Sequence, residues 1–196
     1  MKSNKSANRI RIIGGDWRSR IITFPAVEGL RPTSDRVRET LFNWLGQTLY
    51  GKACLDLFAG SGVLGFEALS RGAERVVMVE NTKTTVESLK QNAATLSAER
   101  LVITNSDALS FLKVAGERFD IIFLDPPYQA KLLPTLFPML SKRLKPEGTV
   151  YFESDQSEEL PPDWKIIKEG RAGRVRFQLA RYIEADSDRT LNPDIS

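Results

Sequence analysis

The strongest constraint on the fold is a regular alternation of short apolar stretches with segments of helical periodicity. The apolar stretches that we interpret as strands lie at residues 53–58, 75–80, 101–104, 119–125 and 148–153. Strands that alternate with helices along a chain are typical of an α/β fold with a doubly wound, mostly parallel sheet. Two further extended stretches, 164–168 and 175–183, follow without an obvious helix between them. They predict an antiparallel hairpin that closes one edge of the sheet.

A helix is predicted just before this α/β unit. Ser34 or Asp35 can serve as its N-cap, and apolar residues then recur on one face through Leu49. The last residues of the chain are polar and acidic, which predicts a disordered tail. We therefore expect a basic N-terminal arm, one α/β domain and a tail, at residues 1–30, 31–183 and 184–196.

Positive charge is concentrated at the start of the chain. Residues 1–38 contain nine Lys or Arg against three acids, a net charge of +6, whereas the whole chain carries only +3. Two short extended stretches, 9–13 and 18–24, flank a glycine turn and predict a β-hairpin. Arginines on a hairpin point in defined directions, so we expect this arm to face a polyanion; a solvated terminus that binds nothing is the alternative. The candidate contacts, which we call the arm arginines, are Arg9, Arg11, Arg18 and Arg20.

The residue types that are missing exclude several kinds of chemistry. The 196-residue chain has no histidine, which rules out a Ser-His-Asp triad, a histidine base and histidine-ligated metals, and no metal is expected. Its single cysteine, Cys54, lies in an apolar stretch and is interpreted as a core residue. Neither a long apolar span nor a signal-type region is present, so a cytoplasmic protein is expected.

The apolar run at 119–124 ends abruptly in Asp125-Pro126-Pro127-Tyr128. Proline fixes φ and donates no ladder hydrogen bond, so the two prolines predict a stiff loop at the carboxyl end of a buried strand. Such a loop presents a carboxylate, a carbonyl and an aromatic ring, which together suit an exocyclic amino group on a planar base. The four residues resemble the signature tetrad of amino-group methyltransferases, whose methyl donor is S-adenosylmethionine. We take Asp125, Pro126 and Tyr128 as the candidate catalytic residues.

A glycine-rich turn at residues 56–65 follows the first strand of the α/β unit. Glycines there let a ligand approach bare backbone, and Glu80 at the end of the next strand could accept two hydrogen bonds from a ribose diol. This pattern predicts nucleoside binding, and by itself it fits a dinucleotide as well as S-adenosylmethionine. The candidate cofactor-binding residues are Asp56, Phe58, Ala59, Gly60, Ser61, Gly62, Glu80, Asn81, Asp107, Ala108 and Asp125.

Four acids help to discriminate between these cofactors. Asp56, Glu80, Asp107 and Asp125 lie at the carboxyl ends of the first four predicted strands, and ligands of open α/β sheets bind outside such ends. Four carboxylates around one crevice would repel a pyrophosphate but would tolerate a zwitterionic amino-acid sulfonium, which favours S-adenosylmethionine. Asp107 could instead be only a helix cap. A noncatalytic RNA-binding module would explain the arm, but it would leave the acids and the Pro-Pro loop without a role.

The chain resembles the bacterial 16S ribosomal RNA guanine-N2 methyltransferase family over nearly its whole length. The segments that carry the resemblance are 9–18, 30–45, 56–73 and 125–128, and the second of them is the most specific. The resemblance implies a Rossmann-like, seven-stranded methyltransferase sheet with S-adenosylmethionine as the donor. It also implies that the substrate is one guanine of 16S rRNA in the small ribosomal subunit or its precursor. A DNA or RNA adenine-N6 methyltransferase, which shares the tetrad, is the alternative; such DNA enzymes usually carry a separate target-recognition region.

The resemblance implies further roles for single residues. Arg31, Thr33, Arg36 and Glu39 would lie across the methionine end of the cofactor or at the RNA entrance. Tyr128 stands where family members often have phenylalanine, and its ring would stack on the extruded base. The candidate RNA contacts are thus the arm arginines together with Arg31, Arg36 and Tyr128. A monomer is the expected state.

Overall fold

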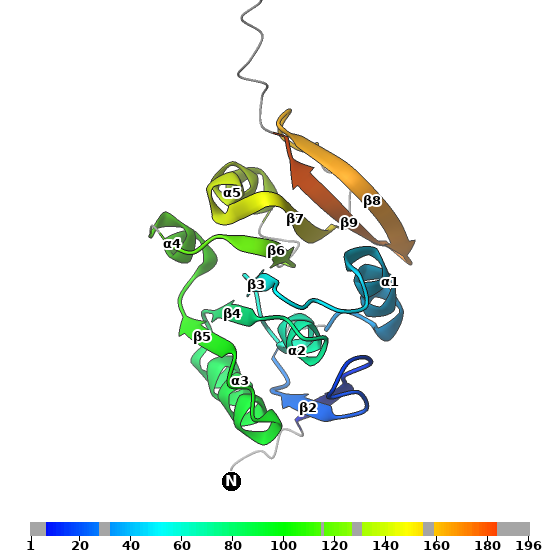
Figure 1. Ribbon diagram of the computed structural model, residues 1–196. Coiled ribbons are helices and arrows are strands. Elements are labelled where there is room, and N and C mark those ends of the chain that lie inside the picture. Colours follow the sequence, from blue (N-terminus) through cyan, green and yellow to red (C-terminus); the bar gives the residue numbers. More distant parts are fainter. Residues whose placement is uncertain (1–6, 28–31, 115, 127–130, 155–158, 184–196) are drawn as a thin grey trace, which may run out of the picture.

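The described part of the chain forms a seven-stranded sheet with helices on both faces and a two-stranded hairpin beside it (Figure 1). The computed structural model describes residues 7–27, 32–114, 116–126, 131–154 and 159–183. The strands of the large sheet are β3 (Ala53–Asp56), β4 (Arg75–Glu80), β5 (Leu101–Asn105), β6 (Phe119–Leu124), β7 (Leu144–Ser154), β8 (Trp164–Ala172) and β9 (Val175–Tyr182).

The strand order is β5-β4-β3-β6-β7-β9-β8. Strands β3 to β7 are parallel, whereas β9 runs antiparallel to both β7 and β8. The predicted parallel sheet with a C-terminal antiparallel hairpin is therefore confirmed, although β7 begins earlier than predicted, at Leu144, and β8 extends to Ala172. The chain leaves β3 for β4 on one side and returns as β6 on the other, so a crevice is expected at the carboxyl ends of β3 and β6.

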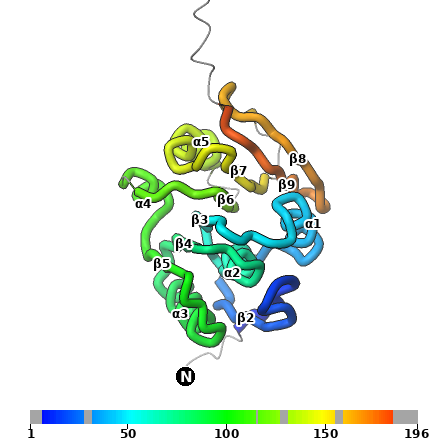
Figure 2. The backbone as a smooth tube through the Cα atoms, viewed as in Figure 1, coloured from blue at the N-terminus to red at the C-terminus, as the bar shows by residue number. Residues whose placement is uncertain are grey.

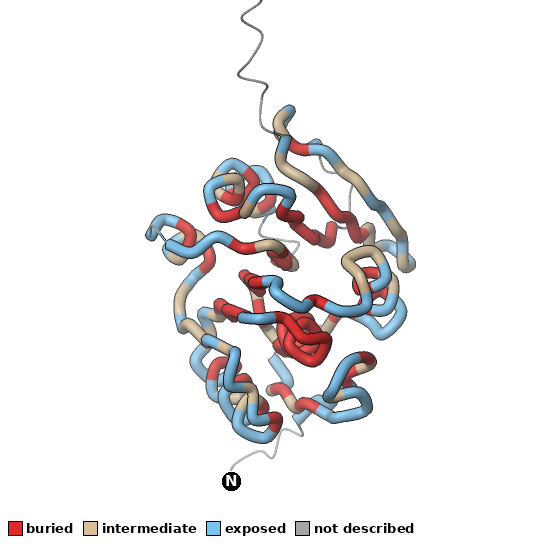
Figure 3. The backbone as a smooth tube through the Cα atoms, in the orientation of Figure 1, coloured by how far each residue is buried: buried red, intermediate tan, exposed pale blue. Residues whose placement is uncertain are grey.

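Two helical layers cover the sheet (Figure 2). One layer contains α1 (Asp35–Leu45), α2 (Val63–Ser70) and α3 (Lys83–Leu96), and the other contains α4 (Ala108–Lys113) and α5 (Leu133–Leu140), which a short 3-10 turn, Ser141–Arg143, follows. Successive strand residues face opposite layers: Cys54 packs in the first and Leu55 in the second. Figure 3 shows that α2 is buried along its whole length.

Helix α1 is shorter than its apolar pattern predicts. The hydroxyl of Ser34 caps it by accepting a hydrogen bond from the backbone N–H of Val37 at 3.5 Å, as predicted. The helix ends at Leu45 because Gly46 takes φ +102°, a conformation that cannot continue a right-handed helix. The predicted extension to Leu49 is wrong; Leu49 is buried from a loop instead.

The predicted N-terminal hairpin is confirmed and packs directly on the body. β1 (Asn8–Arg11) pairs antiparallel with β2 (Ile21–Phe24). Ile22 of β2 is fully buried in the same apolar cluster as helices α1, α2 and α3. The side chain of Asn92 on α3 accepts from the N–H of Thr23 at 3.0 Å and donates to the carbonyl of Thr23 at 2.7 Å. The hairpin is thus fixed by both apolar and polar contacts.

Two predicted boundaries lie outside the described residues. The predicted end of the arm at residue 30 and the predicted tail at 184–196 both fall in segments that the structure does not describe. The division into residues 1–30, 31–183 and 184–196 therefore stays a prediction.

Candidate active site

A cavity of about 970 Å³ opens at the carboxyl ends of the parallel strands. Asp56, Glu80, Asp107 and Asp125 all line it, so the structure brings together the four acids that the sequence predicts around one crevice. Other predicted residues on its wall are Phe58, Ala59, Gly60, Ser61, Asn81, Ala108 and Pro126. Gly62 is not part of this wall; it is the N-cap of α2 with φ +77°, where an added Cβ would lie 2.4 Å from a methyl group of Leu89. These positions are consistent with the predicted cofactor roles, which stay predictions.

Glu80 shapes the glycine-rich turn. One oxygen of its carboxylate accepts a hydrogen bond from the backbone N–H of Gly60 at 3.0 Å, and the other accepts from the N–H of Thr82 at 2.8 Å. Each carboxylate oxygen has a second lone pair, so Glu80 can still accept hydrogen bonds from two ligand hydroxyl groups. The acid that the sequence assigns to a ribose diol also holds the turn that would contact the ligand.

Asp56 is buried at the end of β3, with 3% of its surface exposed. Its carboxylate accepts a hydrogen bond from the N–H of Gly65 at 3.2 Å, which attaches the end of β3 to helix α2. Burial raises the pKa of Asp56 to about 7; the negative charge of Glu80 adds to this rise, and the Gly65 N–H opposes it. A positive charge in the cavity would favour the ionised form of Asp56.

Asp125 directly follows β6, the strand that pairs with β3, and Asp56 is the last residue of β3. Burial raises the pKa of Asp125 well above its usual value, and the charges of Glu153 and Asp56 raise it further. Glu153, on β7, is a buried cavity residue that the sequence analysis missed; the hydroxyl of Tyr151 donates to it at 2.7 Å. Tyr128, the remaining candidate catalytic residue, lies outside the described residues.

Asp107 serves as a helix cap and also lines the cavity. It is the N-cap of α4, where its carboxylate accepts from the N–H of Ser110 at 2.9 Å. This hydrogen bond lowers the pKa of Asp107, so its carboxylate is charged at the mouth of the cavity. The capping role that the sequence left open is confirmed, and a role in binding an adenine amino group stays a prediction.

The arm arginines are all exposed. Arg11 forms an ion pair with Asp35 at 3.5 Å, and the guanidinium of Arg20 donates to the carbonyl of Thr95 at 3.1 Å. Arg36, in the first turn of α1, is also exposed, whereas Arg31 lies outside the described residues. Exposed ion pairs contribute little, so these cations are free to meet an external anion.

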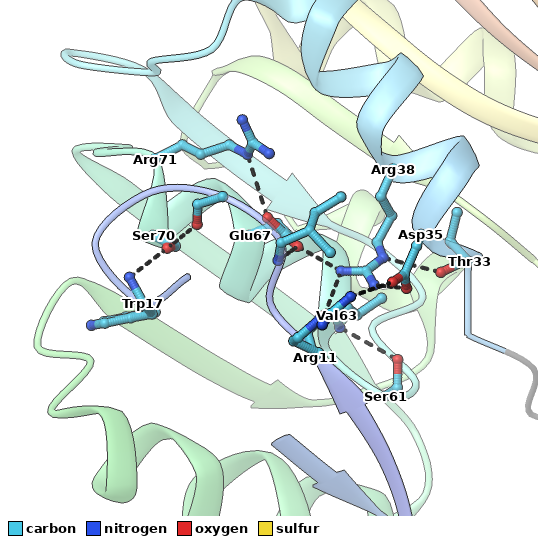
Figure 4. A network of polar contacts seen from close by, with 12 residues as sticks. Arg11, Trp17, Thr33, Asp35, Arg38, Ser61, Val63, Glu67, Ser70 and Arg71 are labelled. Atoms are coloured by element: carbon cyan, nitrogen blue, oxygen red, sulfur yellow. Dashed lines mark hydrogen bonds and ion pairs between the residues drawn. The ribbon is translucent and has the colours of Figure 1, made fainter. Parts of the chain in front are cut away.

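An ion network centred on the buried side chains of Arg38 and Glu67 joins the arm to α1 and α2 beside the cavity (Figure 4). The guanidinium of Arg38, which is fully buried, donates to Glu67 at 2.5 Å and to Asp35 at 2.6 Å. It also donates to the backbone carbonyl of Arg11 on β1 at 3.0 Å and to that of Thr33 at 3.2 Å. Because Thr33 lines the cavity, one side chain links the arm to the cavity wall.

Glu67 completes this network from helix α2. Its carboxylate accepts from the backbone N–H of Ile13 at 2.6 Å and from the guanidinium of Arg71 at 3.4 Å. Burial raises the pKa of Glu67, while the Ile13 N–H and the two arginines act in the opposite direction. Ser70, one turn later, donates to the carbonyl of Gly14 at 2.5 Å. The sequence alone does not point to this network, because charged residues on a helix usually lie on its solvent face.

Two other predicted residues near the entrance differ in position. Thr33 is buried and lines the cavity; the exposed Ser34 and the buried Val37 of the same segment line it too. Glu39 is exposed and is not among the residues of the cavity wall. Ala172 and Val175, at the turn between β8 and β9, also line the cavity; nothing in the sequence pattern pointed to them.

Neither a metal site nor a membrane span is found in the part of the chain that the structure describes. No group of three or more Cys, Asp or Glu side chains there is arranged to hold a metal ion. None of the helices in those residues combines the length and the apolar composition that crossing a membrane requires.

Comparisons with known proteins agree with this architecture. A family profile described as "Conserved hypothetical protein 95" matches residues 10–181. The chain is 42% identical to "Ribosomal RNA small subunit methyltransferase D" of Escherichia coli, over 95% of this chain and 97% of the relative. It is also 42% identical to the protein of the same name from Haemophilus influenzae, over 91% and 97% of the two chains.

Solved structures extend the likeness to three dimensions. An Escherichia coli protein with 39% identity aligns with a TM-score of 0.82, covering 91% of this chain and all of that one. A precorrin-6y C5,15-methyltransferase from Geobacter metallireducens aligns with a TM-score of 0.62 over 82% of this chain and 93% of its own, and at 15% identity it shows the shared fold alone. The chain therefore belongs to the family of the ribosomal RNA small subunit methyltransferases D, as the resemblance of its motifs predicts.

Proposed function

We propose that this protein transfers a methyl group from S-adenosylmethionine to the exocyclic N2 of one guanine in 16S rRNA of the small ribosomal subunit or its precursor. The observation that carries the proposal is that Asp125 and Pro126 line the same cavity as Glu80 and the glycine turn. A nucleoside cofactor and an amino group could therefore meet in one place. The names of the relatives supply the class of substrate. A ribosomal substrate would place the protein in the cytoplasm.

The residues of the cavity fit S-adenosylmethionine better than a dinucleotide. None of the described residues that line the cavity is Lys or Arg, so a pyrophosphate would meet carboxylates without a countercharge. A cation is favoured instead, because it would stabilise the ionised forms of Asp56 and Asp125, whose pKa values burial raises. Glu80 would hold the ribose hydroxyls. When bound, S-adenosylmethionine supplies an electrophilic methyl group on a positively charged sulfur.

Asp125 and Pro126 would prepare the guanine amino group for attack. The Asp125 carboxylate and the Pro126 carbonyl would each accept one N2 hydrogen, which holds the nitrogen in line with the methyl group and favours lone-pair density on it. As the nitrogen becomes positively charged during transfer, both acceptors stabilise that charge. Tyr128 would stack on the extruded base. The methylated nitrogen then loses a proton to Asp125 or to water, so no histidine base is required.

Product identification tests the proposal. The protein and labelled S-adenosylmethionine are incubated separately with unmethylated small subunits, with naked 16S rRNA and with duplex DNA, and the nucleic acid is digested to nucleosides. We expect labelled N2-methylguanosine from the subunits. N6-methyladenosine would instead identify an adenine-N6 methyltransferase. Absence of label from all three substrates would refute the proposed function.

A further inference from the structure

The turn between β8 and β9 forms part of the rim of the cavity. Ala172 and Val175 are paired across the two strands, and both line the cavity. Only Gly173 and Arg174 lie between them, with Gly173 at φ +62°, so the strands are joined by a tight two-residue turn. Turns of this length hold a defined direction relative to their strands. Side chains next to this turn therefore project from a fixed place at the mouth of the cavity.

Two exposed arginines flank this rim. The Nε of Arg171 donates to the carbonyl of Gly173 at 3.0 Å, which fixes the guanidinium along the turn. Arg174 is exposed and has no hydrogen bond or ion pair with another described residue. Arg176, by contrast, is paired with Glu169 at 3.0 Å. Arg171 and Arg174 are thus cations of the turn that an external anion can reach.

Helix α1 carries a further exposed arginine next to residues of the cavity wall. Ser34 and Val37 line the cavity, and the exposed Arg36 lies between them in sequence. Trp44 of α1 stacks on Phe177 of β9 with ring centroids 5.2 Å apart, and Figure 1 shows the β8–β9 turn beside α1. The β8–β9 turn and the start of α1 thus both contribute residues to the cavity wall, and each carries an exposed arginine next to those residues in sequence.

We propose that Arg171 and Arg174 bind the phosphates on either side of the nucleotide that enters the cavity. The inference rests on the proposed function. It gives the β8–β9 turn the task of binding the RNA backbone next to the target base. A base that leaves its stack to reach Asp125 carries its own phosphates to the mouth of the cavity, where Ala172 and Val175 lie. Guanidinium groups match phosphate oxygens in geometry and charge. The arm arginines would bind more distant phosphates, and the turn would position the target strand.

A salt series on a matched pair of variants tests the proposal. The test variant is Arg171→Gln/Arg174→Gln. The control, Lys113→Gln/Arg118→Gln, removes the same charge from two exposed residues at the end of α4 and before β6, elements that Figure 1 shows away from the β8–β9 turn. Affinity for small subunits prepared from cells lacking this protein is measured against KCl concentration, and affinity for S-adenosylmethionine is measured by calorimetry. Both variants should bind the cofactor as the wild type does.

The slope of log affinity against log salt discriminates the outcomes. Each phosphate that the protein no longer binds should reduce the magnitude of this slope by about 0.7 to 0.9. The slope of the test variant should therefore be smaller than that of the wild type by roughly 1.5, whereas the control should keep the wild-type slope. Equal slopes for wild type and test variant, with the wild type still methylating the subunits, would refute this inference and leave the proposed function intact. An equal reduction in the control would also refute it, because the effect would then come from net charge. A wild-type protein that neither binds nor methylates subunits would refute both.

Discussion

Replacing Asp56 with asparagine should make the free protein more stable, relative to the wild type, as the pH rises into the alkaline range. Burial raises the pKa of Asp56 from 3.8 to about 7, with a further contribution from Glu80. A carboxyl whose pKa rises on folding binds more protons in the folded state. Its contribution to stability is therefore fully present below its unfolded pKa and is lost as pH rises through the folded value. Asparagine does not titrate, and its amide oxygen can still accept from the N–H of Gly65.

The magnitude follows from the two pKa values. One pKa unit corresponds to about 1.36 kcal/mol, so the shift from 3.8 to about 7 corresponds to roughly 4 kcal/mol between the acid and alkaline limits. Over the part of this range from about pH 5 to about pH 8, the same linkage gives roughly 2.5 kcal/mol. The free energy of unfolding of Asp56→Asn minus that of the wild type should rise by this amount.

Urea unfolding at the two pH values measures this difference. Asp120→Asn is a control in which the pKa shift has the opposite sign. Burial raises the pKa of Asp120, but hydrogen bonds from Lys145 and from the Ala53 N–H, each at 2.8 Å, lower it overall. Stability from a lowered pKa is present above the unfolded value and is lost below it. Asp120→Asn should therefore be destabilised alike at both pH values, and less so in strong acid. A pH-independent difference for Asp56→Asn would refute a raised pKa at that residue.

Three further predictions concern ligand binding and chemistry. Glu80→Ala should weaken S-adenosylmethionine binding by roughly 1.5 to 3 kcal/mol without changing RNA affinity, and wild-type cofactor affinity in calorimetry would remove Glu80 from the ribose role. Folded Asp125→Ala should lower single-turnover methyl transfer by about 10² to 10³, whereas Tyr128→Phe should stay close to wild type because the ring is proposed to act. Wild-type turnover in Asp125→Ala would contradict the proposed mechanism. Replacing the four arm arginines with glutamine should flatten the salt dependence of small-subunit binding, by slightly less than one unit for each phosphate that the arm no longer binds; an unchanged slope would mean that the arm is a solvated terminus.

The arrangement of the sheet and the cavity could be predicted because both depend on local signals. Strand and helix periodicities indicate the order of elements, and the rule that ligands bind at the carboxyl ends of strands brings Asp56, Glu80 and Asp125 together. The end of α1 could not be predicted in the same way. Leu49 is apolar and buried, as a continued helix would require, but its burial comes from a loop after the left-handed Gly46.

The parts that could not be predicted depend on packing between distant segments. Arg38 and Glu67 are separated by 29 positions, and each alone is typical of a solvent-facing helix residue. Their burial becomes favourable only when α1, α2 and the hairpin meet. Glu153 and Ala172 line the cavity because of where β7 and the β8–β9 turn lie in the sheet. The residue pattern of a single strand does not indicate the place of that strand in the sheet.

The network around the buried Arg38 determines when the arm loses its conformational freedom. Arg38 holds the carbonyl of Arg11, and Glu67 holds the N–H of Ile13, so the backbone next to the arm arginines is fixed when the protein folds. Ordering a residue of backbone opposes association by about 1 to 2 kcal/mol whenever it accompanies binding. Here that ordering would precede any encounter with RNA. The arm should therefore associate as a preformed template, with rapid binding and without the large heat-capacity change of a segment that folds on its partner.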